Sequence, residues 1–139
     1  MDKKPIVLVC VTPQESSKNI VRAGKLLAEK NSAKLEIISV LPLAFNDKRS
    51  DPKIIEEIYN FAKEENGEMS LYFSDEPVFT IAAHIGKIKP VLLVTGFPGE
   101  DSNGLVSTIR LLIPELPISM VDGDKVYNML PFESNQFVK

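Results

Sequence analysis

Residues 5–11 read Pro5-Ile-Val-Leu-Val-Cys-Val11, and residues 90–95 read Pro90-Val-Leu-Leu-Val-Thr95. Both are short, continuous apolar runs rich in β-branched residues, and such runs are typical of strands that are covered on both faces. Strands of this kind belong mostly to parallel sheets with a layer of helices on each side. The two segments therefore predict the centre of an α/β sheet.

The rest of the chain alternates between helical and extended patterns around these two runs. Amphipathic helices are predicted to begin near residues 16, 52, 77 and 105, and further strands are predicted at 35–41, 69–73 and 117–121. This alternation predicts a three-layer αβα domain with a five-stranded parallel sheet and right-handed crossovers. Because the two most apolar strands belong together at the centre, the expected strand order is 3-2-1-4-5. We assign residues 1–123 to this domain and residues 124–139 to a C-terminal tail.

Composition excludes several classes of protein. The chain has 139 residues, and 16 Lys and Arg against 19 Asp and Glu give a net charge of −3, which is unlike the basic surface of a nucleic-acid binder. The single cysteine, Cys10, forbids an internal disulfide and indicates a reducing compartment. The single histidine, His84, leaves no His/Cys set for zinc, and its place on the third helix predicts a surface or half-buried position. No apolar stretch is long enough for a signal peptide or a membrane span, so we expect a cytoplasmic protein with neither nucleic acid nor membrane as a partner.

The expected strand order places a ligand crevice between the first and fourth strands, because open α/β sheets bind ligands where the strand order reverses. Residues 12–17 and 96–104 would wall it. The second wall reads Gly96-Phe-Pro-Gly99-Glu-Asp-Ser-Asn-Gly104, and its glycines would let backbone N–H groups approach a phosphate at the start of a helix. Two observations leave a simple turn open as the alternative: Glu100 and Asp101 would repel an anion, and Asn103 can cap the helix.

Several enzyme classes lack the residues that their chemistry needs. A phosphoryl-accepting receiver needs acidic residues at the ends of the first and third strands, where this chain has Thr12-Pro13 and Phe73-Ser74. No G-x-G-x-x-G follows the first strand, and Leu105 stands where a Walker A loop requires lysine. We therefore expect no enzyme and assign no catalytic or metal-binding residue.

The strand at 6–12, the helix at 16–30, the strand at 35–41 and the segment 90–96 together resemble the universal stress protein family over roughly residues 4–122. The resemblance implies the fold of universal stress proteins and adenine nucleotide alpha hydrolase-like proteins. Many members of this family bind ATP through Gly-x2-Gly-x9-Gly-Ser after the fourth strand. In this chain the matching positions are Gly96, Gly99 and Gly104, with Leu105 in place of the serine and Ser107 where a threonine often follows.

Two departures from the family pattern affect the crevice. Only four residues separate Gly99 from Gly104, where the motif has nine, and Thr12 replaces the aspartate that usually ends the first strand. The short loop resembles the subfamily found in potassium-sensing histidine kinases, some of which recognise cyclic di-AMP through Ser-x-Ser and Phe-Thr-Ala-x-Tyr. Residues 12–14 and 35–39 fall at those positions without the defining side chains.

The resemblance implies a non-catalytic stress or signalling module with a degenerate nucleotide-binding crevice; the alternative is a universal stress protein that binds ATP, AMP or another adenine nucleotide. The expected contacts are, around the base and sugar, Thr12, Pro13, Gln14 and Val40, and, around the phosphate, Gly96, Gly99, Gly104 and Ser107. Such domains commonly pair through the last strand, so we expect a homodimer. The apolar edge Pro117–Val121 would be covered by a second copy, by the tail residues Val126, Tyr127, Met129 and Phe132, or by both.

Overall fold

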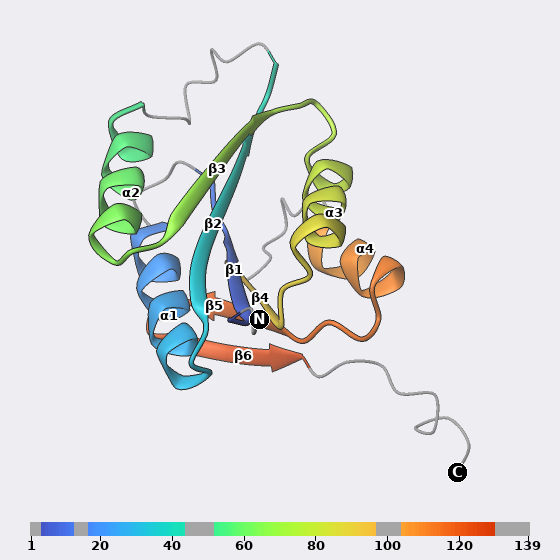
Figure 1. Ribbon diagram of the computed structural model, residues 1–139. Coiled ribbons are helices and arrows are strands. Elements are labelled where there is room, and N and C mark those ends of the chain that lie inside the picture. Colours follow the sequence, from blue (N-terminus) through green and yellow to red (C-terminus); the bar gives the residue numbers. More distant parts are fainter. Residues whose placement is uncertain (1–3, 13–16, 44–51, 97–103, 130–139) are drawn as a thin grey trace.

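The protein folds as one six-stranded sheet with helices on both faces (Figure 1). The computed structural model describes residues 4–12, 17–43, 52–96 and 104–129. In chain order its elements are β1 (Ile6–Cys10), α1 (Ser17–Lys30), β2 (Lys34–Leu41), α2 (Pro52–Glu64), β3 (Glu68–Phe73), α3 (Pro77–Ile88), β4 (Leu92–Gly96), α4 (Leu105–Leu112), β5 (Ile118–Asp122) and β6 (Lys125–Met129).

The strand order β3-β2-β1-β4-β5-β6 confirms the predicted three-layer α/β fold. The first five strands are parallel, and β6 adds an antiparallel partner to β5. β1 lies at the centre, with β2 on one side and β4 on the other, as the two apolar runs predict.

The core consists of two apolar layers, one on each face of the sheet. Val7, Val9 and Val11 of the first strand segment face α1 and α2, whereas Leu8 and Cys10 face α3 and α4. Consecutive side chains of a strand point to opposite faces, so a strand buried on both faces needs apolar residues at every position. This alternation explains the uninterrupted apolar sequence of β1.

α1 lies unusually close to β1 because of one glycine. A Cβ atom placed on Gly24 would collide with Cγ2 of Val9, so only glycine permits this distance between helix and strand. Ion pairs from Lys18 to Glu57 and from Lys25 to Glu65 connect α1 to the chain segment of α2. α1 is therefore held to the sheet by close packing on β1 and to the segment of α2 by two ion pairs.

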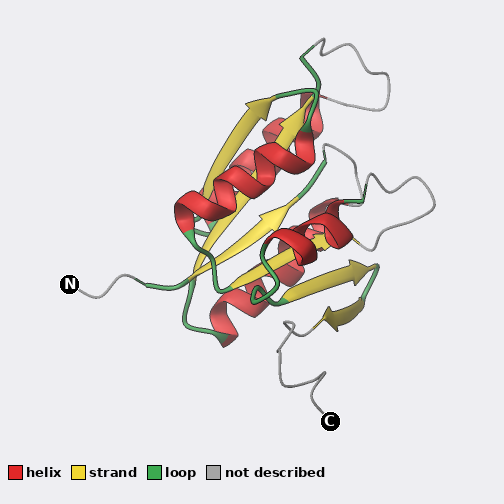
Figure 2. Cartoon of the chain, turned by 90° about the vertical axis from the view of Figure 1, so that its right-hand side faces the viewer, coloured by secondary structure: helices red, strands yellow, loops and turns green. Residues whose placement is uncertain are grey.

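The structure brings the start of the predicted tail into the sheet. A two-residue turn, Gly123-Asp124, with Gly123 at a φ of 63°, reverses the chain so that β6 pairs with β5, and the Ser119 hydroxyl donates a hydrogen bond of 2.6 Å to Oδ1 of Asn128. Figure 2 shows β6 at the edge of the sheet beside β5. The apolar segment 117–121 was expected to pair with a second copy of the chain, with the tail, or with both, and the structure shows that β6, from the tail, pairs with it. Phe132, the last of the tail residues predicted to contribute, lies outside the described residues.

Within the described residues, none of the helices combines the length and the apolar character that crossing a membrane would require.

Candidate functional site

The predicted crevice begins where β1 and β4 end side by side. The two strands are parallel, with Val9 opposite Val94 and Cys10 opposite Thr95, so both chains leave the sheet at the same edge. β2 lies on the other side of β1, which makes this pair the point where the strand order reverses. Ligands of open α/β sheets bind at such a point.

The first wall of the crevice is fixed by a hydrogen bond between the end of β1 and the start of α1. Thr12 is exposed, and its carbonyl oxygen accepts a hydrogen bond from the hydroxyl of Ser17, which is buried. This bond fixes the Thr12 backbone at the carboxyl end of β1. Pro13 and Gln14, the next predicted contacts, lie outside the described residues.

The second wall starts at Gly96, the last residue of β4. A Cβ atom on Gly96 would lie 3.1 Å from Cδ1 of Ile20 in α1, which is tighter than ordinary van der Waals contact. Glycine thus lets α1 approach the exit of β4. Gly99, the second predicted phosphate contact, lies outside the described residues.

Gly104 and Ser107 form the entrance to α4. Gly104 has a φ of 77°, a left-handed conformation that favours glycine, and it directly precedes the helix. The Ser107 hydroxyl is exposed and donates to the Gly104 carbonyl oxygen at 3.1 Å, while its lone pairs can still accept a hydrogen bond. The first turn of α4 holds no acidic residue, so the positive end of the helix dipole is not neutralised there.

β2 contributes two neighbouring residues with opposite orientations. Val40, a predicted contact, is half-buried and packs toward the layer of α3 and α4. Ser39 faces the other layer at the level of Val11, and its hydroxyl is buried without a hydrogen-bond partner in the described part of the chain. A buried hydroxyl normally has a partner, so Ser39 is a candidate ligand contact that the sequence prediction missed. The available signal was a lone hydroxyl near the end of an apolar strand.

Cys10 and His84, the single cysteine and the single histidine of the chain, are both buried. Burial raises the pKa of the Cys10 thiol to about 12, so the thiol stays protonated. His84 is buried, which corrects the predicted surface or half-buried position: Tyr72 of β3 lies against its ring, and the Tyr72 hydroxyl is 2.9 Å from Nδ1 of His84. Burial, assisted by the Lys87 ammonium, lowers the pKa of His84, so the ring is neutral at pH 7.

The strand order and the two helix layers are those of the universal stress protein fold. No protein-family model and no curated protein sequence matches this chain. Among solved structures, the chain is similar to the universal stress protein UspA from Lactobacillus plantarum, with a TM-score of 0.64 and 14% identity over 88% of this chain and 100% of that one.

Two further similar structures hold a nucleotide. A universal stress protein in complex with cAMP gives a TM-score of 0.65 and 19% identity, with 88% of this chain and 100% of that one covered. A universal stress protein from Archaeoglobus fulgidus in complex with dAMP gives 0.51 and 18%, with 85% and 97% covered. At these identities the likeness establishes the universal stress protein fold, and it does not extend to the histidine-kinase subfamily that the short loop resembles.

Proposed function

We propose that this protein is a cytoplasmic, non-catalytic signalling module with a reduced nucleotide crevice, and that the crevice binds an adenosine monophosphate. The proposal rests on the parallel exits of β1 and β4 at one sheet edge, together with the left-handed Gly104 that opens α4, the helix that follows β4. Backbone N–H groups at a helix start favour an anion. The complexes of similar proteins with cAMP and dAMP support a ligand of this size.

A monophosphate suits the crevice better than ATP. The loop from Gly99 to Gly104 has only four residues between its glycines, and two of them, Glu100 and Asp101, are acidic. A short loop offers fewer N–H donors, and the carboxylates repel each added phosphate charge. Thr12 in place of an aspartate removes one polar contact to the nucleoside, whereas the buried, unpartnered hydroxyl of Ser39 offers a hydrogen-bonding group near the end of β2.

A non-catalytic role is supported by the state of the two reactive side chains. The Cys10 thiol is buried and protonated, and the neutral His84 ring is bound to Tyr72 two strands away from β1. Neither group is positioned to abstract a proton from a water molecule in the crevice. We therefore expect ATP to remain intact after prolonged incubation with the protein.

Isothermal titration with AMP, cAMP, ATP and cyclic di-AMP tests the ligand. AMP or cAMP should bind at least as tightly as ATP. Ser107→Glu should weaken AMP binding at least about tenfold, because its carboxylate would stand beside the phosphate in the first turn of α4. Leu111→Glu adds the same charge to the exposed far end of α4 and should change the affinity less than about twofold. No heat from any ligand at millimolar concentration, tighter binding of ATP, or binding of cyclic di-AMP alone would contradict the proposal.

We also propose that the protein forms a homodimer through the edge that β6 presents. β5 is paired with β4 on one side and with β6 on the other, so the segment 117–121 is not at the edge of the sheet. β6 is the edge strand, and it is the strand that can pair with a second copy. Val126 and Tyr127 are each 42% exposed there. An apolar edge strand without protection is a template for pairing with another chain.

The mass in solution tests the dimer. Light scattering coupled to size exclusion should give a dimer for the natural sequence and a monomer for Val126→Lys, because the twofold pairing would bring two new ammonium groups close together. Leu111→Lys, which places the same charge on α4, should leave the dimer intact. A monomer of the natural sequence at micromolar concentration would refute this interface.

A further inference from the structure

A concave surface lies between β3 and α3, away from the predicted crevice. This groove has a volume of about 390 Å³ and is lined by Tyr72, Phe79, Thr80, Ala83, His84 and Lys87. Five of these residues belong to α3, and they form two neighbouring rows on its surface, since residues four apart lie one turn above each other. The volume falls within the range of small-molecule sites, and the groove is separated from β1 by β2.

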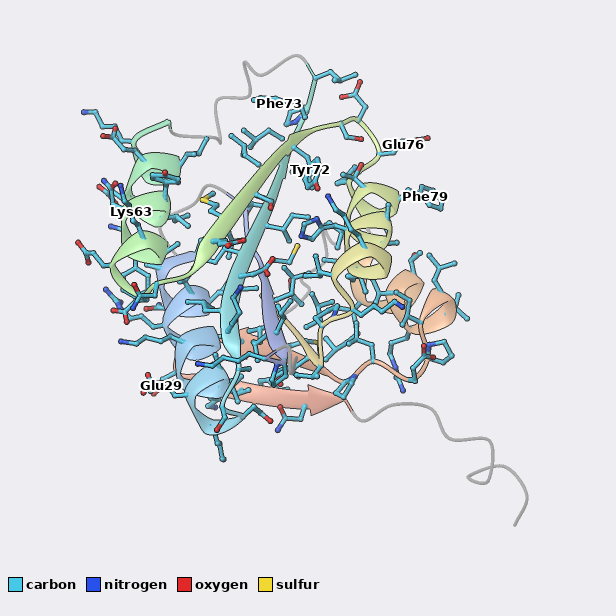
Figure 3. All side chains as sticks on the ribbon, viewed as in Figure 1. Glu29, Lys63, Tyr72, Phe73, Glu76 and Phe79 are labelled. Carbon is cyan, nitrogen blue, oxygen red and sulfur yellow. The ribbon has the colours of Figure 1, made fainter. Side chains whose placement is uncertain are left out.

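The groove has aromatic sides and a low floor. Phe79 is 63% exposed, although its ring is among the largest apolar groups of α3. Figure 3 shows Tyr72 between β3 and α3, and Phe79 projecting from the exposed side of the helix. Ala83, one turn along from Phe79, is exposed and carries only a methyl group, so it leaves space between the two rings. A flat ring can rest on this floor and contact both aromatic side chains.

The polar groups of the groove favour an anion. Lys87 is exposed one turn beyond Ala83 in the same row, and its ammonium is close enough to His84 to contribute to the lowered pKa of that ring. His84 is only 6% exposed, and its Nε2 has no hydrogen-bond partner in the described part of the chain. A buried ring nitrogen without a hydrogen-bond partner lowers the stability of the folded state and is uncommon in proteins. It therefore marks a place where a ligand can supply the missing hydrogen bond.

We propose that the groove between β3 and α3 binds a small aromatic anion. The aromatic body of the ligand lies over Ala83 between Phe79 and Tyr72, and its negative group pairs with the Lys87 ammonium. Ring contacts with Phe79 and Tyr72 supply the apolar part of the affinity. Lys87 is the one cationic side chain among the lining residues, and the His84 ring is neutral. The groove should therefore bind a ligand with one negative charge more tightly than a neutral or cationic ligand of the same shape.

Titration with 1-naphthoate, followed by two-dimensional amide NMR of the full chain, tests the site. The probe should shift amide resonances of Tyr72 and of residues 79–87. Its neutral analogue 1-naphthamide should bind about threefold more weakly, which is the effect of one exposed charge pair. Phe79→Ala should weaken both probes about fivefold through the loss of one ring contact.

Lys87→Gln separates charge from shape. It should weaken 1-naphthoate about threefold and leave 1-naphthamide unchanged, whereas Lys63→Gln, the same change on the exposed surface of α2, should affect neither probe. Leu111→Ala is the matched control for Phe79→Ala, because it removes an apolar side chain that is 81% exposed on α4. Absence of shifts at millimolar 1-naphthoate, shifts centred on residues 104–108, or equal effects of the test and control variants would overturn the proposal.

Discussion

The close approach of α1 to β1 predicts opposite effects for the same substitution at two helical glycines. A Cβ atom on Gly24 meets Cγ2 of Val9, which is fully buried, whereas a Cβ atom on Gly86 in α3 meets nothing within 4 Å. Replacing a helical glycine with alanine stabilises a helix by about 0.5–1 kcal/mol, and both variants should gain this amount. Gly24→Ala should in addition lose about 1–3 kcal/mol, because overpacking displaces either α1 or the Val9 side chain.

We therefore expect Gly86→Ala to raise the free energy of unfolding by about 0.5–1 kcal/mol and Gly24→Ala to lower it by up to about 2.5 kcal/mol. Urea unfolding followed by far-ultraviolet circular dichroism measures both values, and the linear dependence on urea gives the free energies. The expected loss is smaller than the stability of a typical domain, so the Gly24→Ala variant should still fold.

A second substitution tests the cause of the loss. Val9→Ala removes Cγ2 and should by itself destabilise the protein by about 2 kcal/mol. In that background Gly24→Ala should become neutral or stabilising, which gives a coupling energy of about 1–3 kcal/mol between the two positions. Stabilisation of the natural sequence by Gly24→Ala to the same extent as by Gly86→Ala would refute the close contact, and so would additive effects of the two changes.

Three further predictions concern buried polar groups. Burial, and after it the neighbouring Glu68 carboxylate, raises the pKa of Glu36 against a smaller opposing effect of Lys34, so the ionised Glu36 side chain destabilises the fold. Glu36→Gln should therefore stabilise the protein by up to about 1 kcal/mol at pH 7. Chemical unfolding should show this gain shrinking toward about pH 4, where the Glu36 carboxyl becomes protonated in both the folded and the unfolded state. With its pKa at about 12, the buried Cys10 should react with a disulfide reagent at pH 8 at least about a hundredfold more slowly in the native protein than in urea, and equal rates would contradict its burial. Tyr72→Phe should destabilise the protein by about 1–3 kcal/mol, because Nδ1 of the buried His84 would lose its partner; the same change in a His84→Leu background should have much less effect, which thermal unfolding can measure.

The sequence was sufficient for the five parallel strands and for the point where their order reverses. The runs at 5–11 and 90–95 have apolar side chains at nearly every position, and this pattern is typical of a central parallel strand that is buried on both faces. Once the two strands are adjacent, the strand order and the point where it reverses follow from right-handed connections. The sixth strand lies in residues that the sequence analysis assigned to the tail, although Gly123-Asp124 between two extended segments is a signal for the turn of a hairpin.

What only the tertiary structure decided are contacts between residues that are distant along the chain. No sequence period brings Tyr72 to the ring of His84, or shows that Ser39 is buried without a partner beside the end of β1. The need for glycine at position 24 likewise becomes visible only when Val9 lies against α1. Hydrophobic patterning reports which face of an element is buried, but the identity of the atoms that meet there depends on how the elements pack, and packing is set by the whole chain at once.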